Sequence, residues 1–348
     1  MPKFTNEDVR ALMDKPSQVR NVGLIGAMAT GKTSLMDCLG ALSGMLAEEK
    51  IGEARFTHCR KDEQEKGCTL KANATSLVMG PHKFDEKAGE QKILLSMVDT
   101  PGHAEYSAEL SVSLPLIDGA IMMVDGSGSG LSAQTSRHLK DLNAWQVRPV
   151  VFVNRLDVSI NVLEKKAAEI YDDVCQVCDA LNTSIAGIEP PFEGGQVFKV
   201  TPEDGSVIFG SASNGWAFTL PQIAGIYAKK FGIEVDKMAS RLWGGMYFNA
   251  KKKLWTNQAG DGAVRAFDQF VMDPLLKVKS VCMAGDFTKL EKMLGALGVT
   301  LTADDKKHEG KLLFRRVMQL WMPAGISVTS SVVKHVPNPV AAGKARMP

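Results

Sequence analysis

The sequence contains 348 residues, of which 45% are hydrophobic and 23% charged; these values are typical of a globular protein and exclude a disordered or fibrous chain. Its 41 Lys and Arg residues nearly balance 39 Asp and Glu residues, so the net charge of +2 provides no strong field for DNA or an anionic membrane. We find neither a signal peptide nor an apolar run of about 18 residues, the length that a membrane-spanning helix needs. We therefore expect a soluble, cytoplasmic monomer with no membrane or DNA partner.

Short apolar runs with branched side chains, bounded by Gly, Pro or Asp, predict buried strands at 21–25, 92–98, 119–124 and 149–153. Helical patterns lie between them at 32–46, 105–116, 133–144 and 162–181. Strands that alternate with helices are typical of an α/β fold, in which a mostly parallel sheet carries helices on both faces. The polar stretch 81–90 is interpreted as a loop or hairpin connection between two strands.

The chain changes character after Phe218. Residues 220–311 are charged and helical with no strand rhythm, which indicates an inserted or appended subdomain. Prolines among small and basic residues predict a linker or tail over 335–348, of the kind that often precedes another domain. Cys175 and Cys178 form a CxxC on a predicted helix, and we interpret them as half-buried helical cysteines because no partners for a zinc or redox site are evident.

The strongest local motif is a complete GxxxxGK[ST] pattern that follows a predicted strand and opens a helix. In such a P-loop, backbone N–H groups turn toward a phosphate, the lysine reaches the terminal phosphates, and the threonine hydroxyl binds Mg²⁺. A merely glycine-rich turn is the alternative, which this setting disfavours. The predicted phosphate-binding residues are Gly26, Ala27, Met28, Ala29, Thr30, Gly31, Lys32, Thr33 and Ser34.

A second motif, Asn154-Arg155-Leu156-Asp157, decides between adenine and guanine. It follows a predicted strand, at the sheet edge where such folds bind ligands. An aspartate there can accept hydrogen bonds from N1–H and the exocyclic amine of guanine, which adenine does not offer. NxxD alone is common by chance, but 55 residues after Asp99 and behind a strand it predicts a guanine site.

The motif from Asp99 to His103 also ends a predicted strand. We expect Asp99 to act on Mg²⁺ through water, Gly102 N–H to bond a γ-phosphate, and His103 to orient the attacking water; a surface-loop histidine is the alternative. In the charged segment 55–71, Thr69 is a candidate Mg²⁺ ligand only when a γ-phosphate is present, with an ordinary solvated loop as the alternative.

Three small residues complete the expected site. They follow the apolar stretch 207–210, and their backbone N–H groups could contact the guanine oxygen. Alone they are a weak signal. They are Ser211, Ala212 and Ser213.

Together these motifs resemble one family, the eukaryotic and archaeal elongation factor 2, over residues 4–340. The likeness is carried by 60–66, 99–103, 215–219, 321–325 and 335–340. The resemblance implies a P-loop NTPase fold with GTP or GDP and Mg²⁺ as cofactors, the ribosome as partner, and GTP-dependent translocation as the role. It also implies a G domain over 1–220 with a preceding segment 1–20, a helical and sheet insertion over 221–312, a return at 313–334 and a linker or tail from 335.

The sequence departs from the family at several positions. Ala29 stands where the family's P-loop has an acidic residue implicated in hydrolysis, and Arg155 replaces the lysine whose stem packs on the base. Pro115 interrupts the helix after Asp99 to His103, so we expect that helix to be kinked or shortened. The family continues into a β-barrel and three further domains, and we expect no complete translocation from this chain alone.

Three hypotheses follow. The first is a translational GTPase with Lys32, Thr69 and His103 as catalytic residues. The second is a nucleotide-binding switch module with little or no hydrolysis, which Ala29 favours. The third, an ATP-dependent P-loop kinase or ATPase, requires the Asn154 to Asp157 motif to be coincidental. Thr57 lies where the family is phosphorylated, and we favour an ordinary loop threonine there.

Overall fold

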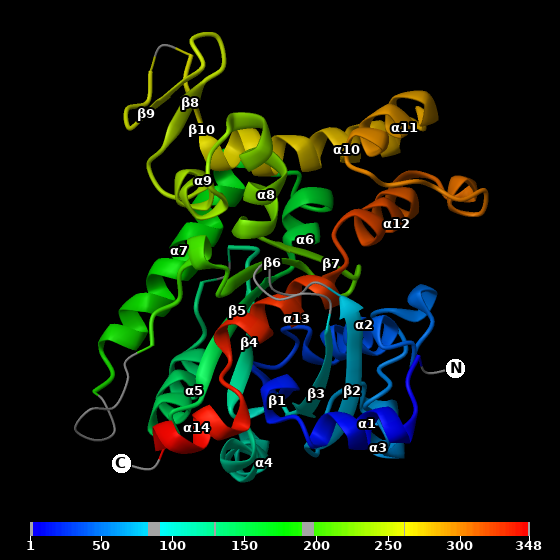
Figure 1. Ribbon diagram of the computed structural model, residues 1–348, viewed down its shortest axis with the longest axis vertical. Coiled ribbons are helices and arrows are strands. Elements are labelled where there is room, and N and C mark those ends of the chain that lie inside the picture. The colour runs from blue at the N-terminus through cyan, green and yellow to red at the C-terminus, as the bar shows by residue number, and fades with distance from the viewer. Residues whose placement is uncertain (1–2, 83–90, 129, 190–197, 261, 347–348) are drawn as a thin grey trace.

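The computed structural model describes residues 3–82, 91–128, 130–189, 198–260 and 262–346. Its centre is a seven-stranded sheet in the order β2-β3-β1-β4-β5-β6-β7, in which only β2 and β7 pair antiparallel to their neighbours (Figure 1). This confirms the predicted α/β fold with a mostly parallel sheet. The strands are β1 (Val19–Gly26), β2 (Asn73–His82), β3 (Gln91–Asp99), β4 (Gly119–Asp125), β5 (Arg148–Asn154), β6 (Val207–Ser211) and β7 (Trp216–Thr219).

The central strands are buried on both faces. Successive residues of β4 alternate between two hydrophobic clusters: Ile121 and Met123 belong to one, Met122 and Val124 to the other. This explains why these strands are continuous apolar runs in the sequence, since each side chain meets a helix layer whichever way it points.

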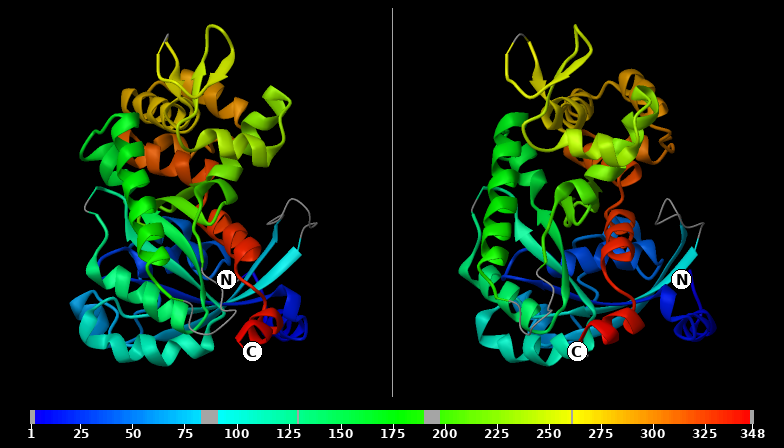
Figure 2. Two further views of the ribbon diagram at one scale, coloured as in Figure 1. Left: turned by 90° about the vertical axis from the view of Figure 1, so that its left-hand side faces the viewer. Right: turned by 60° about the vertical axis from the view of Figure 1, so that its left-hand side comes forward.

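Helices cover both faces of the sheet (Figures 1 and 2). Buried side chains of α2 and α13 pack in the cluster on one face, and those of α4, α5 and α7 in the cluster on the other. The helices of this part are α1 (Asn6–Met13), α2 (Lys32–Leu42), α3 (Lys61–Lys66), α4 (Ser107–Ser113), α5 (Ala133–Ala144), α6 (Leu156–Asn161), α7 (Ala167–Ala186), α13 (Ala324–His335) and α14 (Pro339–Arg346).

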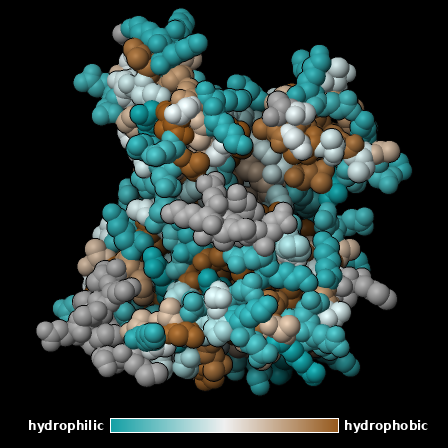
Figure 3. Space-filling model, viewed as in Figure 1, coloured by the Kyte–Doolittle hydropathy of each residue, from teal (hydrophilic) through white to brown (hydrophobic). Residues whose placement is uncertain are grey.

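A second lobe lies beyond the β6–β7 end of the sheet, at the top of Figure 1. Its helices are α8 (Leu220–Phe231), α9 (Val235–Leu242), α10 (Asp273–Ala284), α11 (Phe287–Ala296) and α12 (Gly310–Trp321), with a π-helical turn, Asp268–Met272, before α10. In Figure 3, hydrophilic side chains cover most of the face in view, and hydrophobic ones gather on the upper-right projection, where Figure 1 places α10 and α11.

The residue pattern of 220–311 shows no strand rhythm, yet the structure has strands there, as the resemblance implied. Three short strands, β8 (Tyr247–Asn249), β9 (Leu254–Thr256) and β10 (Val264–Arg265), form a sheet in the order β10-β8-β9. Aromatic rings hold it to the helices: Phe248 lies 4.9 Å from Trp255 and 5.3 Å from Phe270 between ring centroids. Strands of two or three residues, stabilised by contacts with residues distant in the sequence, are too short to show an alternation of apolar and polar residues.

The expected linker over 335–348 also differs from the structure. Helix α13 extends to His335, and α14 follows after a short break. Pro339 is the first residue of α14, where a missing N–H costs nothing and the fixed φ favours a helix start. Arg346 donates to Ile117 O, so α14 is fastened to the sheet just before the first residue of β4. The domain boundaries themselves remain a prediction.

Other boundaries shifted for local reasons. As expected, Pro115 shortens the helix after Asp99 to His103: α4 ends at Ser113 and a 3₁₀ turn follows. The helix expected at 162–181 is α7, which begins later and ends later, and α6, directly after Arg155, is a short helix that was not expected. Most of the expected connection 81–90 lies outside the described residues, but the strands that flank it, β2 and β3, pair antiparallel. No helix in the described ranges has the length and apolar character needed to span a membrane.

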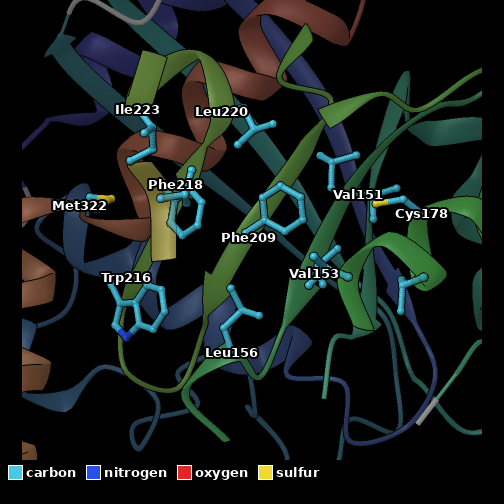
Figure 4. Packing of buried hydrophobic residues seen from close by; sticks show 14 of the residues in the cluster. Val151, Val153, Leu156, Cys178, Phe209, Trp216, Phe218, Leu220, Ile223 and Met322 are labelled. Carbon is cyan, nitrogen blue, oxygen red and sulfur yellow. The ribbon is translucent and has the colours of Figure 1, made fainter. Parts of the chain in front are cut away.

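The core beside β6 gives a test of the packing. Phe209 is fully buried, and its ring centroid lies 5.8 Å from those of Phe218 and Trp243 (Figure 4). We expect Phe209→Ala to lower the free energy of unfolding by about 3–5 kcal/mol, because it leaves a cavity among rings. Urea unfolding measures it, with Leu254→Ala, at a side chain of 61% exposure, as the control. Equal effects of the two changes would contradict this packing.

Candidate functional site

The motifs predicted to act together lie at the ends of parallel strands. Strand β1 lies between β3 and β4, so the chain passes to one side of β1 and then to the other. Ligands in such sheets bind at the carboxyl ends of the strands beside this switch in order. Gly26, Asp99, Asn154 and Ser211 are the last residues of β1, β3, β5 and β6, so one edge of the sheet carries all four motifs.

The loop after β1 turns tightly into α2. Gly31 has φ 92° and Ala29 φ 61°, both left-handed, and glycine adopts this conformation without strain whereas alanine does not. The buried ammonium of Lys32 donates to Gly26 O and Ala27 O, at 2.9 Å each. The Lys32 ammonium is therefore held in a place where the oxygens of a bound phosphate would take over the hydrogen bonds that these two carbonyls now accept.

A buried carboxylate lies next to this loop. Asp99 is fully buried; its Oδ2 accepts from Thr57 Oγ1 at 2.8 Å and from Thr33 Oγ1 at 3.3 Å. Its Oδ1 has no hydrogen-bond partner among the described residues. Burial raises the pKa of Asp99 to about 6, while the Thr57 hydrogen bond and the charge of Lys32 act to lower it. A buried carboxylate oxygen without a partner is costly unless a cation or donor arrives.

The hydroxyls around Asp99 fit a Mg²⁺ ion. Thr33 Oγ1 and Thr69 Oγ1 are 3.1 Å apart, and Thr33 also touches Asp99. Mg²⁺ binds oxygen ligands and keeps several waters, so two hydroxyls and a carboxylate suffice when phosphates supply the rest. No group of three or more His, Cys, Asp or Glu side chains suited to a metal occurs in the described ranges, so an all-protein metal cage is not found there.

Sequence reasoning missed His58 and the role of Thr57. His58 Nε2 lies 3.2 Å from Thr69 Oγ1 and 3.5 Å from Thr33 Oγ1, and burial lowers the pKa of His58. Thr57 is 1% exposed and donates to Asp99, so in this conformation its hydroxyl is closed to solvent. No spacing signal marks either residue, because their contacts cross from one loop to another.

Two acidic side chains hold the segment that carries these residues. Asp37 accepts from the backbone N–H groups of Arg55 and Phe56, at 2.9 and 3.1 Å. Glu63 accepts from those of Leu70 and Lys71, also at 2.9 and 3.1 Å. The segment 55–71, which contains α3, is therefore anchored by a buried carboxylate at each end, while Arg60, Lys61 and Lys66 between them are exposed.

The motif after Asp99 closes over the phosphate loop. A Cβ at Gly102 would lie 2.3 Å from Lys32 Nζ and 2.9 Å from Ala27 O, so the close approach requires glycine. Gln134, on α5, donates to Gly102 O at 2.7 Å. The side chain of His103 is 44% exposed, and its Nδ1 accepts from the backbone N–H of Glu105 at 3.3 Å.

A pocket of ≈ 420 Å³ opens between these loops. Most of the predicted phosphate-loop residues and the predicted cation ligands Thr33 and Thr69 line it, as do basic side chains of the segment 55–71, whereas the buried Asp99 does not. Asp157 and Ser213 do not line it, so it corresponds to the phosphate end of the expected site. The lining residues are Met28, Ala29, Gly31, Lys32, Thr33, Ser34, Arg55, His58, Lys66, Gly67, Cys68, Thr69, Gly102 and His103.

Asn154 joins the phosphate loop to the loop after β6. Its side chain is buried, donates to Thr30 O at 2.7 Å and accepts from Ala212 N–H at 2.9 Å. The Ala212 N–H that we expected to face the guanine oxygen is therefore engaged by Asn154. The neighbouring hydroxyls of Ser211 and Ser213 lie 3.2 Å apart, and Ser213 is left to supply a contact to the base.

Arg155 makes a second link. It has φ 69°, and its guanidinium donates to Asp125 Oδ2 and to Ala29 O, both at 2.8 Å. Its guanidinium is thus tied to β4 and to the phosphate loop, and packing of its stem on a base stays a prediction. Asp157 follows in the first turn of α6, at the same sheet edge.

The Asn154 bridge can be tested by Asn154→Ala. The change leaves Thr30 O and Ala212 N–H buried without a partner, at a cost of about 1–3 kcal/mol in the free energy of unfolding. We expect urea unfolding to show this loss and nucleotide titration to show weaker binding. Asn257→Ala, at an exposed turn, is the control. Unchanged stability and binding in Asn154→Ala would rule out the bridge.

In a comparison with known protein families, the model of the elongation factor Tu GTP binding domain matches residues 17–318. The match contains β1 and the phosphate loop, the motifs that follow β3, β5 and β6, and most of the second lobe. It therefore spans every element that builds the site, and guanine-nucleotide binding is the property of this family. The chain belongs to the elongation factor Tu GTP-binding domain family and is a G domain of the translational GTPase type.

Proposed function

We propose that the chain binds GTP and GDP with Mg²⁺ and hydrolyses GTP on the ribosome, as a translational GTPase whose G domain resembles that of elongation factor 2. The observation that carries the proposal is the cluster of Lys32, Thr33, Thr69 and Asp99 beneath Gly102. A buried carboxylate oxygen with no partner among the described residues, two hydroxyls 3.1 Å apart and a lysine bonded to loop carbonyls are arranged as a phosphate and cation site needs.

The phosphate end of the site would act through this chain's own groups. Backbone N–H groups of 26–31 and the start of α2 bind the phosphates, and Lys32 exchanges its two carbonyl partners for phosphate oxygens. Thr33, Thr69 and Asp99 hold the cation. Mg²⁺, when bound, neutralises charge on the β- and γ-phosphates.

Base selection would depend on Asp157. Its carboxylate accepts two hydrogen bonds from guanine that adenine cannot donate. Support comes from Asn154, which fastens the loop of Ala212 to the phosphate loop and so fixes the distance between base and phosphate contacts. The hydrogen bonds that Asp157 can accept from guanine but not from adenine disfavour the ATP-dependent hypothesis.

Hydrolysis would depend on His103. The imidazole lines the pocket but accepts from the N–H of Glu105, so it must turn to orient a water on the γ-phosphate. The Gly102 carbonyl accepts from Gln134, and this bond fixes the backbone position from which the His103 side chain extends. We infer that ribosome contact supplies this reorientation, as the resemblance implies.

A second candidate function is a nucleotide switch with little hydrolysis. Ala29 favours it, because a methyl group occupies the left-handed position where the elongation factor 2 family has an acidic side chain. The nucleotide site is the same in both candidates. They differ only in turnover.

Nucleotide choice is tested with the full chain and Mg²⁺. We expect GTP and GDP to bind at least about a hundredfold more tightly than ATP. Asp157→Asn should weaken GTP by about 10–100-fold, because a charge-assisted pair is lost, and should favour xanthine nucleotides, whose carbonyl meets the new amide. Asp304→Asn, on an exposed side chain of the other lobe, is the control. A guanine preference that survives Asp157→Asn would contradict the base assignment.

Turnover is tested by phosphate release with and without ribosomes. The enzyme proposal expects stimulation by ribosomes, and a loss of about 10²–10⁴-fold in His103→Ala, the range for a positioned acid–base group. His308→Ala, an exposed histidine of the second lobe, is the control. Tight GTP binding without stimulated turnover would support the switch module instead.

A further inference from the structure

An imidazole lies among the oxygens of the expected cation site. His58 is 5% exposed, and its Nε2 faces the hydroxyls of Thr69 and Thr33 at 3.2 and 3.5 Å. These are the two hydroxyls that the preceding subsections give to the cation. A site built for Mg²⁺ alone would be lined by oxygen, so the nitrogen needs an explanation.

The three atoms form a triangle of suitable size. Thr33 Oγ1 to Thr69 Oγ1 is 3.1 Å, and the edges to His58 Nε2 are 3.2 and 3.5 Å. Neighbouring ligands of an octahedral cation at about 2.1 Å lie about 3.0 Å apart. Small inward shifts would therefore turn this triangle into one face of a coordination shell, with Asp99 Oδ2 3.3 Å from Thr33 Oγ1 on its other side.

The backbone holds His58 from both sides. Its N–H donates to Arg55 O at 2.9 Å, and its carbonyl accepts from Gln64 Nε2 at 2.9 Å. Arg55 N–H is in turn bonded to the buried Asp37. These bonds fix the backbone at His58, from which the imidazole reaches Thr69 and Thr33.

We propose that His58 supplies a nitrogen ligand to the cation of the nucleotide site, so that a borderline divalent cation such as Mn²⁺ or Co²⁺ binds there more tightly than the oxygen ligands alone would hold it, and can replace the Mg²⁺ of the proposed function. Imidazole suits such ions, whereas Mg²⁺ prefers oxygen. The inference rests on the proposed function, because it concerns the cation that accompanies the nucleotide. The alternative is that His58 only hydrogen-bonds Thr69 and never meets the metal.

The test uses Mn²⁺ with the full chain and a non-hydrolysable GTP analogue, measured by pulsed electron paramagnetic resonance. Direct ligation predicts ¹⁴N coupling from an imidazole, which changes to the ¹⁵N pattern when the histidines are ¹⁵N-labelled. We expect His58→Asn to lose the coupling and His308→Ala to retain it. Competition with Mg²⁺ should show that His58→Asn lowers the preference for Mn²⁺ over Mg²⁺ at least about tenfold.

The outcomes separate the two proposals. If the GTP analogue binds with Mg²⁺ and bound Mn²⁺ shows no histidine nitrogen, the His58 assignment is overturned and the proposed function stands. If neither nucleotide nor cation binds, both are overturned. Should His58→Asn fail to fold, the labelled wild-type spectrum and its Mn²⁺ to Mg²⁺ competition decide alone.

Discussion

The site depends on one buried charge. Asp99 ends β3 with one carboxylate oxygen accepting from two hydroxyls and the other without a partner in the described structure. Burying such a group is unfavourable unless something compensates it. The parallel pairing of β1 with β3 brings Asp99 beside Lys32 and Thr33, so the compensation comes from the phosphate loop and from the cation that loop is arranged to share.

The loops at this edge act as one unit because side chains tie them together. Asn154 connects Thr30 with Ala212, and Arg155 connects Asp125 with Ala29. A ligand that moves the phosphate loop must therefore also move the loops that surround the base. Each of these links crosses between separate strand ends, which explains why they appear only in the folded chain.

The second lobe is joined to the same assembly through α12. Arg315 donates to Ile51 O at 2.7 Å, and Arg316 lies 2.8 Å from Glu48 and 2.6 Å from Asp305. Gly52, which follows Ile51, approaches Ser213 so closely that a Cβ at Gly52 would lie 2.4 Å from the carbonyl oxygen of Ser213. The segment that precedes residues 55–71 thus contacts both α12 of the second lobe and the loop after β6.

Features that depend on local pattern were predictable from the sequence. The sheet followed from apolar runs buried on both faces, and Pro115 shortened its helix as expected. Strand β7 is only four residues long, and α14 begins at a proline in a segment whose composition is typical of a tail. Neither element therefore shows a clear periodic pattern of apolar residues. His58 escaped notice because its partners lie 11 and 25 positions away.

A crystal structure of the full chain with GDP and Mg²⁺ tests the account most directly. The account predicts phosphates on the amides around Lys32, a cation between Thr33 and Asp99, and guanine against Asp157. A phosphate pocket left vacant, or a base held away from Asp157, would contradict it.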